Sequence, residues 1–305
     1  MAYFTSSEGK KQIYYEIIEP AKGRRPKAVI QVIHGMCEYF GRYKEFSDFM
    51  TKHGYVVAGD DHLGHGRTAT NEEERGFFAY SSGWRFLVRD EKKMTDILRE
   101  KYPDVPIVIF GHSMGSFIAR LYMSWYPDGI AGALFMGTSS GVPAGAASTA
   151  VKLLENAAGT KTHLNSGQWM FYNFLTRRVP DKTGELDWIT RDKEKTEFFK
   201  NDPLGDFAFT AGAYRDLVKL LSEISDRDWA YSLPVDMPIM LMSGEEDPIG
   251  DYGKGVRKVY RRLVKAGMKN VSIRLYVDAR HELINEINRQ EVYEDILNWV
   301  GKITG

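Results

Sequence analysis

A serine with a glycine two residues away on each side stands between a predicted strand and a predicted helix, and no other feature constrains the fold as strongly. The run is Gly111-His112-Ser113-Met114-Gly115. The apolar residues 106–110 before it predict a buried strand, and residues 116–126 after it predict a helix. So sharp a turn crowds the backbone, and the two glycines relieve that crowding. The motif predicts an α/β fold in which the Ser113 hydroxyl stands above the sheet edge as a nucleophile.

Short β-branched runs alternate with longer amphipathic stretches along most of the chain, which is typical of parallel strands joined by crossover helices. Predicted strands cover 28–33, 55–58, 106–110, 130–136, 238–242 and 271–277, and predicted helices cover 43–53, 83–102, 116–126, 253–266 and 289–303. From about 138 to 232, small residues and then aromatic and polar clusters replace this pattern. We therefore expect a core of residues 1–141 and 233–305, with a mostly helical cap inserted over 142–232 above the strand ends.

The composition is that of an ordinary globular protein and disfavours several classes of partner. Hydrophobic residues make up 43% and charged residues 27%, and 41 basic side chains balance 41 acidic ones. Without a basic excess, we expect no nucleic-acid partner. The chain has no run of about 18 apolar residues for a transmembrane helix and no apolar signal-peptide core, so we expect a cytoplasmic protein. Cys37, the single cysteine, is expected to be a buried thiol.

Two later loops offer a base and an acid for the serine. A serine hydroxyl becomes nucleophilic when a histidine takes its proton and an acid orients that histidine. In folds with this motif the acid comes first in the sequence and the histidine second, each on a loop after a strand. Asp247 follows the predicted strand 238–242, and His281 follows the predicted strand 271–277. We therefore expect Ser113, Asp247 and His281 to form a triad.

The choice of acid has competitors nearby in the sequence, namely Glu245, Glu246, Asp251 and Asp278. Asp247 is preferred because it lies deepest in its loop and Pro248 fixes the turn behind it. Glu246 is the next candidate. The alternative for Asp247 is a solvated acidic turn without a catalytic role.

Hydrolysis also needs backbone donors for the oxyanion that develops on the attacked carbonyl. The amide of Met114, directly after the nucleophile, is one expected donor. The second is expected from Met36 in His34-Gly35-Met36, which follows the predicted strand 28–33. His34 itself is expected to hold its loop by hydrogen bonds, and His112 to be a packing residue.

A glycine-rich turn carries Asp60, Asp61, His62 and His65, which together suggest a metal site. The spacing lacks the usual third and fourth ligands, so we expect no metal there. The imidazoles are expected to hydrogen-bond to the neighbouring backbone instead.

Residues 169–175 form an aromatic cluster in the insertion, apolar on nearly every face. The interpretation we favour is the insertion's own hydrophobic core. The alternative is that some of these side chains line an acyl-chain groove or touch a lipid interface.

Together, these motifs resemble the monoacylglycerol lipase and lysophospholipase branch of the α/β-hydrolases, a group that includes serine aminopeptidase-like hydrolases. The motifs are His34-Gly35-Met36, Glu38, Gly41-Arg42-Tyr43, Asp61-His62-Leu63-Gly64-His65-Gly66-Arg67, Gly111-His112-Ser113-Met114-Gly115, residues 244–248 and Arg280-His281-Glu282. The resemblance spans about 28–141 and 235–300, and the insertion matches only loosely.

The resemblance implies a mostly parallel eight-stranded sheet flanked by helices, a helical cap, no cofactor, and ester hydrolysis through an acyl-enzyme. It assigns Ser113, Asp247 and His281 to the triad, and the amides of Met36 and Met114 to the oxyanion hole. In two places the chain departs from the pattern. Met36 stands where such lipases often have a small residue, and Ser116 replaces a frequent glycine. Both departures bear on the substrate and remove no catalytic group.

We predict a carboxylic-ester hydrolase for a small acyl ester, such as a monoacylglycerol or a lysophospholipid. A peptidase or amidase with the same triad is the alternative, because fold and triad do not choose the bond. A ligand-binding protein on a hydrolase scaffold would need a damaged triad. A haloalkane dehalogenase would need a carboxylate at position 113.

Overall fold

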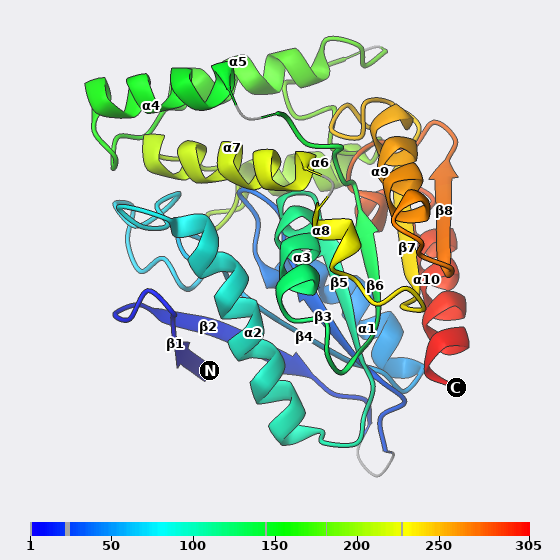
Figure 1. Ribbon diagram of the computed structural model, residues 1–305. Coiled ribbons are helices and arrows are strands. Elements are labelled where there is room, and N and C mark those ends of the chain that lie inside the picture. Colours follow the sequence, from blue (N-terminus) through cyan, green and yellow to red (C-terminus); the bar gives the residue numbers. More distant parts are fainter. Residues whose placement is uncertain (1, 22–24, 144, 181, 227) are drawn as a thin grey trace.

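An eight-stranded sheet forms the centre of the molecule, in the order β1-β2-β4-β3-β5-β6-β7-β8 (Figure 1). The computed structural model describes residues 2–21, 25–143, 145–180, 182–226 and 228–305. Strands β3 to β8 are parallel, whereas β1 and β2 are antiparallel at one edge. The strands are β1 (Ala2–Thr5), β2 (Gln12–Ile18), β3 (Val29–Ile33), β4 (Val56–Asp60), β5 (Ile107–His112), β6 (Ile130–Met136), β7 (Ile239–Gly244) and β8 (Val271–Tyr276).

Helices cover both faces of this sheet, and a group of them lies above the carboxyl ends of the strands (Figure 1). The helices are α1 (Lys44–Lys52), α2 (Gly83–Lys101), α3 (Met114–Trp125), α4 (Ala146–Ala158), α5 (Asn165–Thr176), α6 (Lys193–Asn201), α7 (Ala211–Ser225), α8 (Asp228–Tyr231), α9 (Lys254–Lys265) and α10 (Arg289–Thr304), with short 3-10 turns at η1 (Phe40–Tyr43) and η2 (Leu283–Asn285). The predicted mostly parallel eight-stranded sheet with flanking helices is confirmed.

The predicted strands and helices of the core are confirmed to within about two residues at each end. The two N-terminal strands did not stand out in the sequence. β1 is half exposed in strict alternation, and β2 mixes buried and half-buried positions around a charged residue. Edge strands of this kind lack the continuous apolar run that marks a strand buried on both faces.

Alternation along β3 shows how the sheet divides the core into two layers. Val29 and Ile33 belong to the apolar cluster shared with α2, α3 and α9, whereas Ile30 and Val32 belong to the cluster shared with α1 and α10. All five residues of β3 are buried, as expected for a central parallel strand with helices on both faces. Each fully buried aliphatic side chain contributes about 1.5–3 kcal/mol to stability. The sheet is therefore a rigid base for the loops at its carboxyl edge.

The insertion supplies α4, α5, α6 and α7, which lie at the carboxyl ends of the central strands (Figure 1). α7 packs against α2, α3 and α4 and connects this upper group to the core. Thr210 caps α7 by accepting a hydrogen bond from the Ala213 amide, and Asp192 caps α6 in the same way.

The turn from β5 to α3 depends on the two glycines of the motif. A Cβ atom at Gly115 would lie 2.0 Å from the carbonyl oxygen of Ile33 and 2.4 Å from that of His34. A Cβ atom at Gly111 would lie 2.6 Å from the Gly115 carbonyl oxygen. These neighbours are backbone atoms of buried segments and cannot move aside. Only glycine lets the first turn of α3 approach the end of β3 this closely.

We expect Gly115→Ala to destabilise the protein by about 3 kcal/mol or more, because its methyl group overlaps two backbone carbonyls. Gly184→Ala is the matched control, since a Cβ atom there meets nothing within 4 Å, and it should change stability by less than about 0.5 kcal/mol. Urea unfolding followed by circular dichroism measures both effects. Equal midpoints for the two variants would contradict the steric argument.

Candidate active site

Ser113 lies between the end of β5 and the start of α3, with φ 52° and ψ −122°. A positive φ is rare for a residue with a side chain and is found where the surrounding structure holds the backbone firmly. The Ser113 amide donates to the Met136 carbonyl at 2.9 Å, and the Ser113 carbonyl accepts from the Ser116 amide at 2.9 Å and the Ser116 hydroxyl at 2.6 Å. Ser116, a departure from the family pattern, therefore helps to hold the strained turn.

His281 and Asp247, from the loops after β8 and β7, lie in direct contact. The Nδ1 atom of His281 is 3.0 Å from Oδ1 of Asp247. The second carboxylate oxygen accepts from the Ser243 hydroxyl at 3.2 Å, and Oδ1 also accepts from the Ile249 amide at 2.8 Å. In the described chain, no hydrogen bond links Glu246 to His281. The structure thus brings together the preferred acid and the predicted histidine, and leaves the next candidate outside.

The environment of Asp247 keeps its carboxylate charged. Complete burial by itself would raise its pKa, but the charge and hydrogen bond of His281 and two backbone amides outweigh this effect, so the pKa of Asp247 is lowered. A carboxylate can only accept hydrogen bonds, so the hydrogen of the pair is on Nδ1 of His281. Nε2 is then the ring nitrogen that the pair with Asp247 leaves free. It is buried without a hydrogen-bond partner among the described residues, and His281 lines the same cavity as Ser113.

Neighbouring rings and a glycine hold the His281 imidazole in place. The rings of Trp188 and His112 each lie 5.0 Å from it, centroid to centroid. A Cβ atom at Gly137 would lie 2.9 Å from its Cε1 atom. The ring is thus confined on several sides, and His281 lines the cavity together with Ser113.

Residues 34–36, which we call the oxyanion loop, run beside the elbow, and Met36 and Met114 both line the cavity. The His34 ring hydrogen-bonds to two backbone groups. Its Nδ1 atom lies 2.8 Å from the Gly35 carbonyl oxygen, and its Nε2 atom accepts from the His62 amide at 3.0 Å. Burial and the neighbouring His62 and His65 lower the pKa of His34. His34 is therefore a neutral hydrogen-bonding residue that holds its loop, as the sequence predicted.

A buried ionic cluster beneath the cavity was not found by sequence reasoning. Arg42 forms a two-pronged ion pair with Glu282, with both N–O distances 2.8 Å, and contacts Glu38 at 3.2 Å. Glu38 accepts from the Gly35 amide and from the Tyr43 hydroxyl at 3.0 Å. The cluster joins the oxyanion loop to the residue directly after His281. Its members appear in the family motif, but the sequence does not show that they meet.

His112 belongs to this cluster as well and is more than the packing residue we expected. Its ring packs beside His281, yet its Nδ1 atom also lies 2.8 Å from Glu38 Oε1. Burial would raise the pKa of Glu38, but the opposite charges of His112 and Arg42 lower it overall. For His112, burial acts in the lowering direction and Glu38 outweighs it, so the pKa of His112 is raised. The two side chains form a charge-assisted pair next to the nucleophile.

The cavity above Ser113 has a volume of about 240 Å³ and is apolar over most of its wall. α5 contributes Phe171, Tyr172 and Leu175, and α7 contributes Leu217 and Leu221. Glu38, His112 and Glu282 are also in the lining. A chamber of this kind suits a ligand with an apolar chain and one polar group.

The aromatic cluster of α5 divides between two surroundings. Phe171, Tyr172 and Leu175 face the cavity, whereas Trp169, Met170 and Phe174 are 59%, 65% and 55% exposed. The favoured interpretation of this run as an interior core is therefore wrong for half of it. The groove and surface alternative describes the run better.

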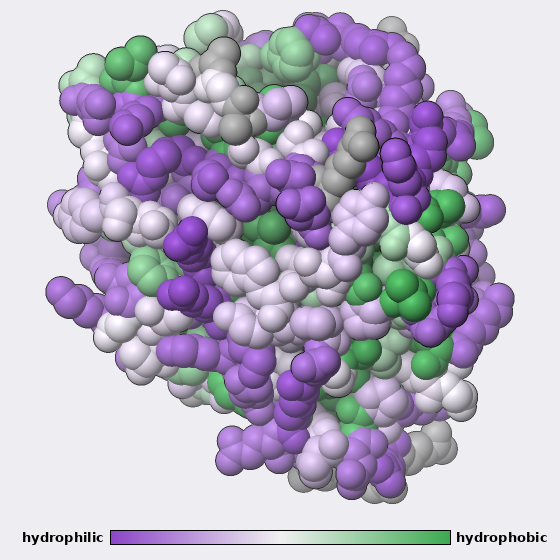
Figure 2. Space-filling model, in the orientation of Figure 1, coloured by the Kyte–Doolittle hydropathy of each residue, from purple (hydrophilic) through white to green (hydrophobic). Residues whose placement is uncertain are grey.

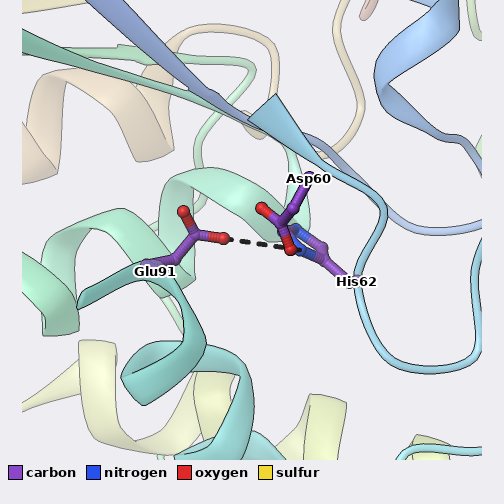
Figure 3. A group of neighbouring side chains, drawn as sticks. All are labelled: Asp60, His62 and Glu91. Atoms are coloured by element: carbon purple, nitrogen blue, oxygen red, sulfur yellow. Dashed lines mark hydrogen bonds and ion pairs between the residues drawn. The ribbon is translucent and has the colours of Figure 1, made fainter. Parts of the chain in front are cut away.

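Most polar side chains of the turn after β4 hydrogen-bond to backbone amides, as predicted. Asp61 accepts from the amides of Phe40 and Arg67, and His65 accepts from the Cys37 amide at 3.2 Å. Cys37 itself is a buried thiol, as expected. Asp60 and His62 differ from their neighbours, because both face Glu91 of α2 (Figure 3).

Comparison with known proteins places the chain among hydrolases. The family model described as "Serine aminopeptidase, S33" matches residues 24–288. A thermostable carboxyl esterase from Bacillus coagulans, solved in complex with glycerol, is 33% identical with a TM-score of 0.90, covering 100% of this chain and 98% of that one. A monoacylglycerol lipase of Mycolicibacterium smegmatis is 24% identical over 96% of this chain and 94% of its own length. A monoglyceride lipase of Mus musculus is 28% identical over 90% and 82%.

We expect Glu38→Gln to lower the free energy of unfolding by about 3 kcal/mol near neutral pH, because it leaves the buried His112 without a charged partner and removes one of the two carboxylates that pair with Arg42. The folded pKa of Glu38 lies below its ordinary value of 4.5, so its contribution is present above that pH and is lost as the pH falls through the folded value. His112 has the opposite pH dependence. Because its folded pKa is raised, its contribution to stability is present at low pH and is lost as the pH rises through that folded value.

Urea unfolding of the wild type and Glu38→Gln at about pH 3 and about pH 7 tests this expectation. The difference between their free energies of unfolding should be smaller at the lower pH. Glu45→Gln is the control, because Glu45 forms its ion pairs at the surface, where its side chain is 53% exposed, and it should cost less than about 1 kcal/mol. A gap that does not change with pH would contradict the assigned charges.

Proposed function

The chain belongs to the serine aminopeptidase S33 family, and within that family we propose that it hydrolyses a monoacylglycerol or a similar single-chain acyl ester. It is an ester-cleaving serine hydrolase, as its monoacylglycerol lipase relatives and its carboxyl esterase neighbour indicate, and the peptidase alternative is not favoured. The observation that carries the proposed chemistry is that His281 lines the same cavity as Ser113 and that its buried Nε2 atom has no hydrogen-bond partner among the residues the structure describes.

In the proposed mechanism, Ser113 is the nucleophile and His281 is its general base. Nε2 of His281 takes the hydroxyl proton as the serine oxygen attacks the ester carbonyl. Asp247, 3.0 Å from Nδ1, orients the ring and stabilises its charged form. The amides of Met36 and Met114 donate to the oxyanion. His281 then returns the proton to the departing alcohol, and a water molecule releases the acid from the acyl-enzyme by the same steps.

The cavity lining supports an ester with an apolar acyl chain and a hydroxyl-bearing alcohol. Phe171, Leu217 and Leu221 offer an apolar wall for the chain. His112 also lines the cavity, and its Nε2 atom has no hydrogen-bond partner within the described residues. We assign this nitrogen to the alcohol part of the substrate, because Nδ1 is already taken by Glu38. A glycerol-like leaving group would supply the matching hydroxyl.

Residues 142–232, as a helical cap, would carry the substrate from a lipid surface into this cavity. Large apolar side chains are exposed on α4, α5 and α6, namely Leu153, Leu154, Trp169, Met170, Phe174 and Phe198. Hydrophobic residues are visible along the edge formed by α4 and α5 in Figure 2, among hydrophilic ones. In the described part of the chain, no helix is long and apolar enough to cross a bilayer. We propose transient contact with a lipid interface through these helices, and the cytoplasmic location stays a prediction.

We expect Ser113→Ala to lower kcat/KM for monoacylglycerol by about ten-thousand-fold or more while leaving the fold intact. The variant should also lose covalent labelling by a fluorophosphonate probe. Ser124→Ala is a matched control on the same helix, since its hydroxyl donates to the Leu121 carbonyl and does not line the cavity. Substantial turnover by purified Ser113→Ala would refute the assignment.

We expect Leu221→Trp to shift the preference of the enzyme toward esters with short acyl chains, because the larger side chain occupies part of the cavity that Leu221 lines. Its kcat/KM for long-chain monoacylglycerol should fall about tenfold or more, with a smaller effect on short p-nitrophenyl esters. Leu153→Trp is the control, since Leu153 is 64% exposed and outside the cavity. Equal losses on all chain lengths would place the acyl chain elsewhere. Faster cleavage of aminoacyl amides than of esters would contradict the proposed substrate class.

A further inference from the structure

Three ionisable side chains meet in the interior behind the oxyanion loop. Asp60 ends β4, His62 lies in the turn after it, and Glu91 lies in α2, and their side chains face one another in Figure 3. One potential ligand atom of each lies within 4.8 Å of the others. The residues are only 1%, 2% and 0% exposed. Within the ranges that the structure describes, no other group of three His, Cys, Asp or Glu side chains has this geometry.

The His62 imidazole presents one ring nitrogen to both carboxyl groups. Its Nε2 atom lies 3.1 Å from the His34 carbonyl oxygen. A carbonyl only accepts, so Nε2 carries a hydrogen and Nδ1 is the nitrogen that can bind a metal. Nδ1 lies 3.3 Å from Asp60 Oδ2 and 3.4 Å from Glu91 Oε1. One imidazole nitrogen and two carboxyl groups, all common metal ligands, thus face one another.

Two carboxylate oxygens of the group are left without hydrogen-bond partners in the described chain. They are Oδ1 of Asp60 and Oε1 of Glu91. Among the same residues, no Lys or Arg forms an ion pair with either carboxylate. A buried, unpaired carboxylate oxygen is costly and rare in folded proteins. Glu91 Oε1 lies 3.4 Å from His62 Nδ1, so a cation held between the three side chains would satisfy it.

We propose that Asp60, His62 and Glu91 bind a zinc ion. Zinc prefers imidazole nitrogen and carboxylate oxygen at about 2.0–2.1 Å in a tetrahedron, which places its ligand atoms about 3.3–3.4 Å apart. The two distances from His62 Nδ1 are 3.3 and 3.4 Å. Octahedral magnesium would need ligand atoms about 2.9 Å apart, and magnesium and calcium both prefer oxygen ligands alone. The mixed nitrogen and oxygen donor set and the two spacings from Nδ1 therefore favour zinc.

The surroundings of the three ligands match those of a structural metal site. The His62 ring is oriented by the His34 carbonyl, and the Glu91 carboxylate by the Gln31 side-chain amide at 2.8 Å from Oε2. Metal ligands are commonly fixed by such outer hydrogen bonds. With three protein ligands, the fourth position of the tetrahedron is left to a water molecule. The three side chains are buried and lie outside the lining of the cavity, so the ion holds the turn after β4 to α2 and takes no part in turnover.

The zinc site also supports the oxyanion loop from behind, because the His62 ring stacks on the His34 ring with 3.8 Å between centroids. Sequence analysis expected no metal here, since the polar turn alone lacks a third ligand. Glu91 supplies that ligand from a helix about thirty residues further along, and only the packing of α2 on the sheet brings it to His62.

The test compares metal content in the wild type, Glu91→Gln and Asp216→Asn, each purified without chelator from cells grown with added zinc. Glutamine keeps the shape of Glu91 and can donate to Asp60, so the variant should fold. Asp216 is a matched control because it is equally buried but pairs with Arg215. We expect about one zinc per chain in the wild type and in Asp216→Asn, and about one fewer in Glu91→Gln.

Thermal unfolding and a cobalt spectrum provide two further measurements on the wild type. Protein from zinc-supplemented cells should have a Tm about 5 °C or more above that of protein from zinc-depleted cells, and Glu91→Gln should show no such difference. Cobalt in place of zinc should show the intense visible bands of a four-coordinate ion, a readout that does not depend on how any variant folds. None of these measurements depends on ester hydrolysis.

Zinc bound equally by the wild type and Glu91→Gln would overturn the proposal, and so would a wild type that contains no zinc. Octahedral cobalt bands would overturn it as well.

Discussion

The close approach of Gly115 to the carbonyls of Ile33 and His34 is the contact on which the site depends. It presses the start of α3 onto the end of β3 and so places the Met114 amide beside the oxyanion loop. The same turn holds Ser113 at φ 52°, a conformation that costs on the order of 1–3 kcal/mol. Two strands buried on both faces, together with the Ser116 hydroxyl, supply the rigidity that maintains it. A serine on a flexible loop would relax out of this geometry.

Ion pairs and hydrogen bonds between buried charged side chains connect the separate loops of the site. Asp247 holds His281 from one side of the cavity, and the ionic cluster of Glu38, Arg42 and Glu282 lies on the other. Buried charges of this kind are tolerated only when each has a partner of opposite sign and good geometry. Removing one member leaves its partners less well compensated. The oxyanion loop and the histidine loop are thereby fixed relative to each other.

The core and the insertion contribute different things to the enzyme. Strand ends of the core carry the candidate triad, while α5 and α7 of the insertion supply much of the apolar cavity wall. Trp188, between α5 and α6, packs on His281 and so joins the two parts. The family match covers both parts, since it spans residues 24–288. We propose that side chains of residues 142–232 select the acyl chain, because α5 and α7 supply apolar wall to the cavity.

Local patterns in the sequence were enough to predict the central strands, the elbow at Ser113 and the loops that carry Asp247 and His281. These features depend on near neighbours in the chain: apolar periodicity, glycines in a tight turn, and a polar loop after a strand. The two N-terminal strands β1 and β2 were missed because their half-exposed residues carry little apolar signal.

Contacts between distant segments were decided by the tertiary structure alone. Examples are the pairing of His112 with Glu38, the division of α5 between cavity and surface, and the meeting of Glu91 with His62. Each requires knowing which face of a helix packs on which neighbour. Residue spacing within the chain does not encode that choice, because it is made by the packing of the whole core.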